Sequence, residues 1–387
     1  MVTRVIRHIG ELTTNDPTAG DLTVMGRLHD AALVVDDHRV LWTGPDAWAP
    51  DADEMIDAAG AAVVPGFVDS HTHLVFAGER SDEFEARMAG ERYDGGGIAR
   101  TVAATRAATT EHLRAVTSAR LAELRAGGVT TVEVKSGYDL TVEGEGRLVS
   151  IAREFTDEVT FLGAHVVPSE FRGDRDGYVE LVRGAMLRAC APVARWADVF
   201  CDEGAFSVDE ARHILLSARD AGLGVRLHGN QLADSGGVAL AVELDAASVD
   251  HCTFVGDDDL GALAASSTVA TLLPGAEFST RSPYPSARRM LDAGVCVALA
   301  TDCNPGTSYV TSMGFVVALA VREMGMRVDE ALWAVTRGGA RALRRDDVGH
   351  LGVGARADLN ILAAPRAAHL AYRPGGSLVG RSLRAPD

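Results

Sequence analysis

The segment VVPGFVDSHTH, residues 63–73, is an apolar run that ends in two histidines. Its apolar part has the continuous hydrophobicity of a parallel strand that is buried on both faces. His71 and His73 lie two positions apart, and on an extended chain side chains at this spacing project to the same face. We therefore predict a buried strand over residues 63–70, followed by two imidazoles that face the same way.

Seven further apolar runs with polar ends follow, separated by stretches of helical pattern such as residues 111–126 and 208–221. They cover residues 129–135, 159–165, 197–202, 224–228, 247–251, 268–274 and 295–302. Eight such units over about 280 residues match a (β/α)₈ barrel of the TIM type, an α/β fold whose active sites lie at the carboxyl ends of the strands. An open doubly wound sheet is the alternative architecture.

The two ends of the chain have a different pattern. Residues 33–40 and 358–362 are short strand-like pieces near Gly and Pro turns, without helices between them. We assign both ends to one small β-sandwich domain, residues 1–64 with 350–387, and the barrel to residues 65–349. The glycine triplet at 95–97 lacks the Lys-Ser or Lys-Thr of a phosphate-binding loop, so a mobile flap is expected there.

The chain has 387 residues, of which 54 are acidic and 37 basic, giving a formal net charge of −17. This charge argues against nucleic acid as a partner, and an anionic ligand must be held by local cations. No apolar run approaches the ~18 residues of a membrane span, and the amino-terminal residues lack a signal-peptide core. The five cysteines form no CxxC pair. We therefore expect no membrane partner and a cytoplasmic location.

Polar side chains stand at or just after the carboxyl ends of the predicted strands. They are His71, His73, Lys135, His165, Asp202, His228, His251 and Asp302. Packing alone does not explain why five of the twelve histidines occupy such positions. A lone HxH pair is weak evidence, but His228 and Asp302 complete a set of three histidines and one carboxylate that zinc or iron accepts.

Several longer motifs resemble the imidazolonepropionase family of the amidohydrolase superfamily. They are HTHLVFAGERSDEF, EVKSGYDL, TFLGAHVVP, DVFCDEGAFS, LHGNQL, SVDHC and TDCNPGTS, in this order and spacing. The resemblance covers residues 65–343, and the later GxGARADLNIL stretch is typical of the superfamily's small domain. It implies hydrolysis of the lactam C–N bond of 4-imidazolone-5-propanoate, a small anionic substrate of histidine degradation, to N-formimino-L-glutamate.

The resemblance also implies which residues form the site. One divalent or trivalent metal ion, zinc or alternatively iron, would be bound by His71, His73, His228 and Asp302. Substrate contacts carry over to Arg80, Tyr138, His165, Gln231, Asn304, Gly306 and Thr307. A homodimer is common in such barrels and is expected as a possibility.

The chemistry supports roles for individual residues. Opening a cyclic amide needs an activated water and an acid that protonates the leaving nitrogen, and a metal ion lowers the pKa of its water to about 7. Asp302 can accept the proton of the nucleophile, and His251 and His165 are the candidate acids. A structural role for His251 beside Asp250 is the alternative. Arg80 is the candidate partner of the propionate, since a guanidinium can bind a carboxylate at two points.

Lys135 is the only lysine beside 36 arginines. In binuclear amidohydrolases a lysine at a strand end becomes a carbamate that bridges two metals. The resemblance implies one metal here, so we expect Lys135 to orient Glu133 or the loop at Tyr138. We interpret Cys201, Cys252 and Cys303 as small buried apolar residues.

Two other functions are open to such a barrel. A deaminase of the same superfamily typically has HxxE after the third metal histidine, whereas this chain has His228-Gly-Asn-Gln231, and an amide cannot carry the proton. A metal-free scaffold is the alternative from another class. Such proteins have usually lost metal ligands, whereas the four candidate ligands are present here.

Overall fold

The computed structural model describes residues 2–90 and 97–386. Gly95 and Gly96, and with them most of the predicted flap, lie outside the described residues. Internal contacts divide the chain into two compact units. One contains Met1–Ser70, Glu123–Thr131 and Ser312–Asp387, and the other contains His71–Ala122 and Val132–Thr311. The predicted domain boundaries at 64/65 and 349/350 stay a prediction.

The larger sheet is a nearly closed barrel of eight parallel strands. In spatial order they are β6 (Phe67–Asp69), β7 (Val129–Lys135), β8 (Glu158–Ala164), β9 (Trp196–Cys201), β11 (Leu227–Gly229), β12 (Ser248–His251), β13 (Val269–Leu272) and β14 (Val297–Leu299), and β10 (Gly224–Val225) pairs with β9. The ring is completed beyond the strand ends, where Asp302 N donates to His71 O at 3.1 Å and His73 N to Cys303 O at 3.0 Å. The predicted barrel is confirmed, and the open sheet is wrong.

Among the predicted strands, the first differs most from the structure. Residues 63–70 split into β5 (Ala62–Pro65), which pairs in the other sheet, and β6, which belongs to the barrel. Gly66 separates them, and a Cβ at this position would lie 2.2 Å from the hydroxyl of Thr130. The chain therefore changes sheets at a residue where the close approach of Thr130 leaves no room for a side chain, and a hydrophobicity pattern does not reveal such a change.

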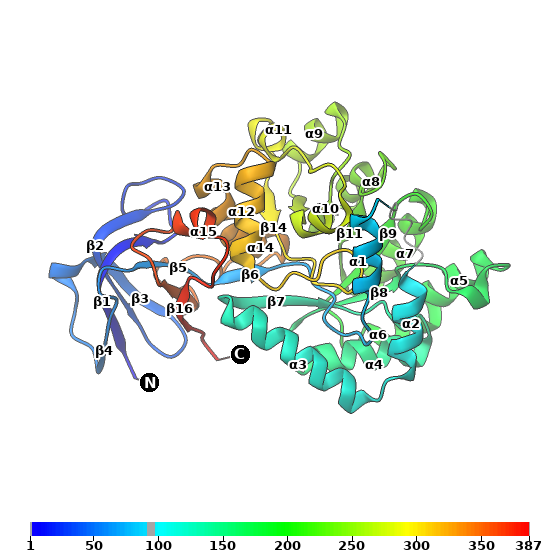
Figure 1. The fold of residues 1–387 in the computed structure, drawn as a ribbon, viewed down its shortest axis with the longest axis horizontal. Coiled ribbons are helices and arrows are strands. Elements are labelled where there is room, and N and C mark those ends of the chain that lie inside the picture. Colours follow the sequence, from blue (N-terminus) through cyan, green and yellow to red (C-terminus); the bar gives the residue numbers. More distant parts are fainter. Residues whose placement is uncertain (1, 91–96, 387) are drawn as a thin grey trace. The chain divides into compact units, whose positions relative to one another are not determined.

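Helices follow the barrel strands as the β/α pattern predicts. Their bounds are α1 (Ser81–Met88), α2 (Ile98–Ala107), α3 (Thr110–Ala126), α4 (Val142–Arg153), α5 (Arg175–Leu181), α6 (Leu187–Cys190), α7 (Val208–Asp220), α8 (Gly237–Glu243), α9 (Asp257–Ala264), α10 (Pro274–Thr280), α11 (Ala287–Asp292), α12 (Met313–Glu323), α13 (Val328–Trp333), α14 (Gly339–Ala342) and α15 (His369–Tyr372). The short 3₁₀ helices η1 (Asp46–Trp48) and η2 (Ser169–Phe171) and the π-helical segments η3 (Val182–Met186) and η4 (Ala334–Gly338) complete the set. In Figure 1, α4 and α7 lie beside the strands on which they pack, β8 and β9.

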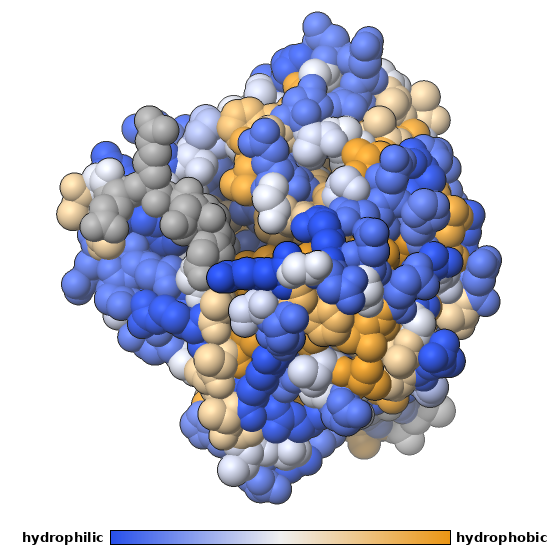
Figure 2. Space-filling model, turned by 90° about the vertical axis from the view of Figure 1, so that its right-hand side faces the viewer, coloured by the Kyte–Doolittle hydropathy of each residue, from blue (hydrophilic) through white to orange (hydrophobic). Residues whose placement is uncertain are grey.

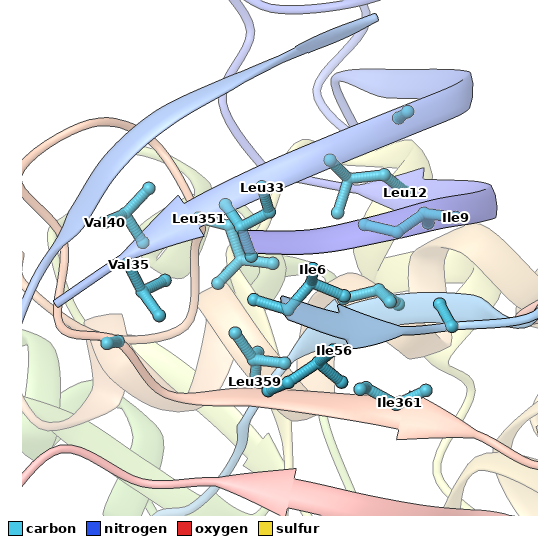
Figure 3. Packing of buried hydrophobic residues seen from close by; sticks show 14 of the residues in the cluster. Ile6, Ile9, Leu12, Leu33, Val35, Val40, Ile56, Leu351, Leu359 and Ile361 are labelled. Carbon is cyan, nitrogen blue, oxygen red and sulfur yellow. The ribbon is translucent and has the colours of Figure 1, made fainter. Parts of the chain in front are cut away.

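Both chain ends build the second sheet, as expected. It contains β1 (Arg4–Thr13), β2 (Arg27–Val35), β3 (Val40–Pro45), β4 (Glu54–Asp57), β5, β15 (Leu359–Leu362) and β16 (Val379–Leu383), in the order β16-β15-β5-β1-β2-β3 with β4 beside β1. The seven strands form one mixed sheet, where the two facing sheets of a sandwich were expected. Apolar side chains from distant parts of the sequence, among them Ile6, Leu33 and Leu359, pack together between these strands (Figure 3).

Hydrophilic side chains cover most of the face shown in Figure 2, and hydrophobic atoms reach this surface in smaller groups between them. This distribution agrees with the charge excess of −17. Within the described ranges, no helix combines the length and the apolar character that crossing a bilayer requires.

Candidate metal centre

Three histidines and one carboxylate converge at the carboxyl ends of the barrel strands. His71 and His73 follow β6, His228 lies in β11, and Asp302 follows β14; each is at most 3% exposed. The Nε2 atoms of His71 and His73 are 3.2 Å apart, and each lies 3.5 Å from Asp302 Oδ1. The ring of His228 is centred 4.5 Å from that of His71. The structure thus brings the four predicted metal ligands together.

Two buried carboxylates set the orientation of two of these histidines. Asp250 Oδ2 accepts from His71 Nδ1 at 2.7 Å, and Asp198 Oδ1 accepts from His228 Nδ1 at 3.0 Å. With the proton on Nδ1, the lone pair of each Nε2 is directed toward the centre of the cluster, which is the arrangement that metal-binding histidines require. Burial also lowers the pKa of His71 and His73 well below the usual value, which keeps both imidazoles neutral.

The donor set fits a metal ion. Asp302 Oδ2 is buried and has no hydrogen-bond partner in the described part of the chain. A buried oxygen of this kind is unfavourable unless it has a donor or a cation beside it. Three imidazole nitrogens and a carboxylate oxygen are ligands that zinc binds in protein sites. The site therefore has the composition and the unmet bonding capacity of a metal centre.

Backbone conformation at the strand ends helps to turn these side chains inward. His251 and Asp302 have φ values of 79° and 52°, and Asn230, two residues after His228, has 54°. Residues other than glycine seldom adopt such values, and they persist only where the surrounding structure holds them. The backbone hydrogen bond from Asp302 N to His71 O is one such restraint.

Lys135 lies beneath the histidines in a fully buried group of charges. Its Nζ is 2.9 Å from Glu133 Oε1, 2.8 Å from Asp198 Oδ2 and 3.9 Å from Asp250 Oδ2. Burial alone would lower the pKa of this ammonium, but the carboxylates of Asp198 and Glu133 raise it above its usual value. A carbamate forms on a neutral amine, so this protonated lysine is a poor carbamate precursor. The contact with Glu133 agrees with the predicted orienting role.

The buried charges around the histidines bear on whether a metal ion fits this site. Arg226 Nη2 lies 3.4 Å from Asp250 Oδ2, so two buried cations, Lys135 and Arg226, face the three carboxylates of Glu133, Asp198 and Asp250. Asp302 adds a fourth buried carboxyl group, whose pKa burial raises well above its usual value. The buried carboxyl groups thus outnumber the two buried cations, and a bound cation would compensate their charge.

A pocket opens above this centre. Its lining includes the predicted substrate contacts Arg80, Tyr138, His165, Gln231, Asn304, Gly306 and Thr307, together with His73, His228, His251 and Asp302. Phe200 and Ile98 also line it. Sequence reasoning missed these two because an apolar residue in a strand or helix looks like a core residue. Asp202 is not part of the lining; it accepts hydrogen bonds from the backbone of Gln231 at 2.6 Å and Leu232 at 2.9 Å, and so anchors that loop.

Arg80 is buried, and its guanidinium is already bound at two points. Nε and Nη2 donate to the carboxylate of Glu83 at 3.0 and 2.6 Å. Nη1 lies beside Gly306, where an added Cβ would come within 2.4 Å of it. Glu83 therefore occupies the Nε–Nη2 edge. Nη1 and the second N–H of Nη2 are the donors on the side of Gly306.

The two candidate acids differ in their surroundings. His165 Nδ1 donates to Gly137 O at 3.0 Å, which directs the lone pair of Nε2 away from this bond. Burial, aided by nearby His228, lowers the pKa of His165 to about 4, so the neutral ring can accept a hydrogen bond but holds no acidic proton at Nε2. Burial likewise lowers the pKa of His251 well below its usual value, so both rings are neutral and the contrast lies in their hydrogen bonds. His251 Nδ1 is buried without a hydrogen-bond partner in the described residues, while Asp250 binds His71 instead.

Asn304 organises the loop after β14. Its Oδ1 accepts from Gly306 N and Thr307 N at 2.8 Å each, and its Nδ2 donates to Asp302 O at 2.7 Å. The side-chain amide of Asn304 is thus used within its own loop, where it fixes the position of Asp302, Gly306 and Thr307.

Comparison with known proteins agrees with this geometry. The family model of the amidohydrolase family matches residues 62–376, so the chain belongs to that family. The imidazolonepropionase of Streptomyces griseus is 58% identical over 385 residues, covering 100% of this chain and 99% of the relative. That of Mycolicibacterium smegmatis is 60% identical over 384 residues, covering 99% of this chain and 97% of the relative. Within the amidohydrolases the chain is a hydrolase of the imidazolonepropionase family.

Solved structures show the same fold at low sequence identity. A mutant of atrazine chlorohydrolase from Arthrobacter aurescens, complexed with zinc and atraton, matches with a TM-score of 0.71 and 20% identity over 99% of this chain and 92% of that one. N-isopropylammelide isopropylaminohydrolase from Burkholderia multivorans matches with a TM-score of 0.72 and 20% identity over 100% and 97%. At this identity the likeness concerns the fold alone.

Proposed function

We propose that this protein hydrolyses the lactam C–N bond of 4-imidazolone-5-propanoate to N-formimino-L-glutamate with one divalent metal ion, zinc or alternatively iron. The observation that carries the proposal is the convergence of three histidines and Asp302 at the floor of a pocket that also contains a buried arginine. The names of the relatives support the reaction. The surplus of buried carboxyl groups over buried cations supports a bound cation.

The four ligands would be His71, His73, His228 and Asp302. An ion held there supplies a Lewis acid and lowers the pKa of a water molecule to about 7. Asp302 Oδ2, which has no other partner in the described residues, is placed to accept the proton of the attacking water. His251, which lines the pocket together with Asp302, is the candidate donor of a ring N–H to the leaving nitrogen.

The remaining lining residues would bind and orient the substrate. Nη1 of Arg80 pairs with the propionate, and the lone pair on Nε2 of His165 accepts from a ring N–H. The hydroxyls of Tyr138 and Thr307 and the amide of Gln231 supply further hydrogen bonds. Gln231 has no proton to exchange near neutral pH, which argues against deamination. The homodimer and the cytoplasmic location stay predictions.

An assay with freshly generated imidazolonepropanoate tests this function. We expect its ultraviolet absorbance to fall in the presence of the protein, to stop falling after chelation, and to resume when zinc or iron is returned. N-formimino-L-glutamate should appear in the same amount as the imidazolone consumed. A protein that is fully loaded with metal but leaves the imidazolone unchanged would contradict the proposal.

Gly306→Ala tests the placement of Arg80. The new Cβ would come within 2.4 Å of Nη1, so the guanidinium has to move. We expect KM to rise roughly tenfold, equivalent to about 1.4 kcal/mol, with unchanged metal content. Steady-state kinetics of Gly306→Ala, Arg80→Met and the double variant provide the check. If the glycine acts by making room for Arg80, the substitution at Gly306 should add little to Arg80→Met; additive losses would contradict this.

A further inference from the structure

A buried carboxylate outside the pocket lining binds the loop that carries two pocket residues. Glu145 lies in the first turn of α4 and is fully buried. Its Oε2 accepts from Gly137 N at 2.8 Å, and its Oε1 accepts from Asp139 N at 2.9 Å and Leu140 N at 2.7 Å. Three backbone N–H groups of one short loop thus converge on a single carboxylate.

The loop, residues 136–140, has a conformation that needs external support. Gly137 and Leu140 have φ values of 106° and 63°, and such a value is unfavourable for leucine. Arg106 adds one restraint by donating from Nε to Asp139 O at 2.7 Å. Of the loop's backbone N–H groups, that of Ser136 donates to Thr160 O at 2.9 Å, and those of Gly137, Asp139 and Leu140 donate to Glu145.

Two predicted substrate contacts depend on this loop. Tyr138 stands between Gly137 and Asp139, the two residues whose N–H groups bind opposite oxygens of Glu145. His165 donates from Nδ1 to Gly137 O, and its ring is centred 5.2 Å from that of Tyr138. The same loop therefore fixes the direction of the Tyr138 side chain and the tautomer of His165.

Ordinary structural roles do not account for Glu145. Thr141 already caps α4, since its side chain accepts from Gly144 N at 3.0 Å. Glu145 forms no ion pair within residues 2–90 and 97–386. A carboxylate buried without a cation is tolerated where several N–H donors are directed at it, and here all the backbone donors come from the loop beside the pocket.

We infer that Glu145 is a positioning residue for substrate binding, which acts by holding the 136–140 loop so that Tyr138 and His165 face the substrate. This inference rests on the proposed function, because the substrate contacts of Tyr138 and His165 belong to it. Loss of Glu145 should change KM and leave metal binding unchanged, since none of its hydrogen bonds reaches a candidate metal ligand.

Glu145→Gln tests the inference with a side chain of the same shape. Its NH₂ group cannot accept the hydrogen bond of a backbone N–H, so at least one anchor is lost. We expect KM for the imidazolone to rise tenfold or more, with unchanged metal content. Glu143→Gln is the matched control, because Glu143 is exposed in the same helical turn and loses the same charge. An equal KM in the two variants would overturn the inference.

Hydrogen exchange and a second variant, Glu145→Asp, distinguish a failure of this inference from a failure of the proposed function. Hydrogen exchange of a peptide covering residues 136–140 should be faster in Glu145→Gln than in Glu143→Gln, and unchanged exchange would overturn the inference whether or not the protein turns over this substrate. Faster exchange in a protein that leaves the imidazolone intact would overturn the proposed function alone. If Glu145→Gln fails to fold, Glu145→Asp, which keeps the carboxylate one methylene further from the loop, should still raise KM; a KM equal to that of Glu143→Gln would overturn the inference.

Discussion

His228→Ala is expected to abolish turnover and to release the metal in the same step. The site has three histidines and one carboxylate. The ring of His228 is oriented by its hydrogen bond from Nδ1 to Asp198 Oδ1 at 3.0 Å. A catalytic metal site keeps few protein ligands to spare, so the loss of one leaves the ion weakly bound. We expect kcat/KM to fall by roughly a thousandfold or more, which corresponds to about 4 kcal/mol of transition-state stabilisation.

The check is metal analysis of the purified variant together with kinetics at substrate concentrations below and above KM. His213→Ala is the control, because His213 is an exposed histidine of α7 and its removal should change neither quantity. Turnover of His228→Ala at the wild-type rate would show that the candidate ligands are wrongly assigned. Two tightly bound metal ions in each wild-type chain would contradict the single-ion site.

Lys135→Met is expected to destabilise the fold more than any substitution of a surface cation. The ammonium lies within 3 Å of Glu133 and Asp198, and all three side chains are fully buried. Removing one partner of a buried ion pair leaves the other charges uncompensated, and such changes typically lower the free energy of unfolding by ~3–5 kcal/mol. Methionine fills a similar volume, so the expected loss arises from charge rather than from a cavity.

The midpoint of urea unfolding measures this effect, with and without a chelator. Arg153→Met is the matched control: Arg153 pairs with Asp157 at 2.7 Å, but both side chains are at least half exposed, so little change is expected. Equal midpoints for the two variants would mean that the buried charges are compensated by some other group. Because Asp198 also orients His228, the Lys135 variant should in addition bind the metal more weakly.

The barrel was predictable because its elements follow from local patterns. The strand expected at residues 129–135 is β7, Val129–Lys135, and the helix expected at 111–126 is α3, Thr110–Ala126. A run of apolar residues, a polar end and a helical period are properties of neighbouring residues, so the sequence displays them directly. The same holds for the ligands, because the carboxyl ends of all parallel strands meet at one edge.

Other parts of the site cannot be predicted from patterns among neighbouring residues in the sequence. Asp198 and Asp250 lie inside apolar strands, and only the pairing of β11 with its neighbours brings them beneath His228 and His71. The sequence likewise does not show that Glu83 occupies the Nε–Nη2 edge of Arg80, or that Gly66 marks a change from one sheet to the other.

The sequence by itself determined the barrel, the candidate metal ligands and the family, because these depend on the order and spacing of residues along the chain. The tertiary structure decided the protonation of Lys135, the tautomers of the histidines and the anchoring of the Tyr138 loop by Glu145. These features depend on burial and on distances of about 3 Å between residues on different strands and helices. Such distances are set by strand register and side-chain packing, which become defined only when the whole barrel has folded.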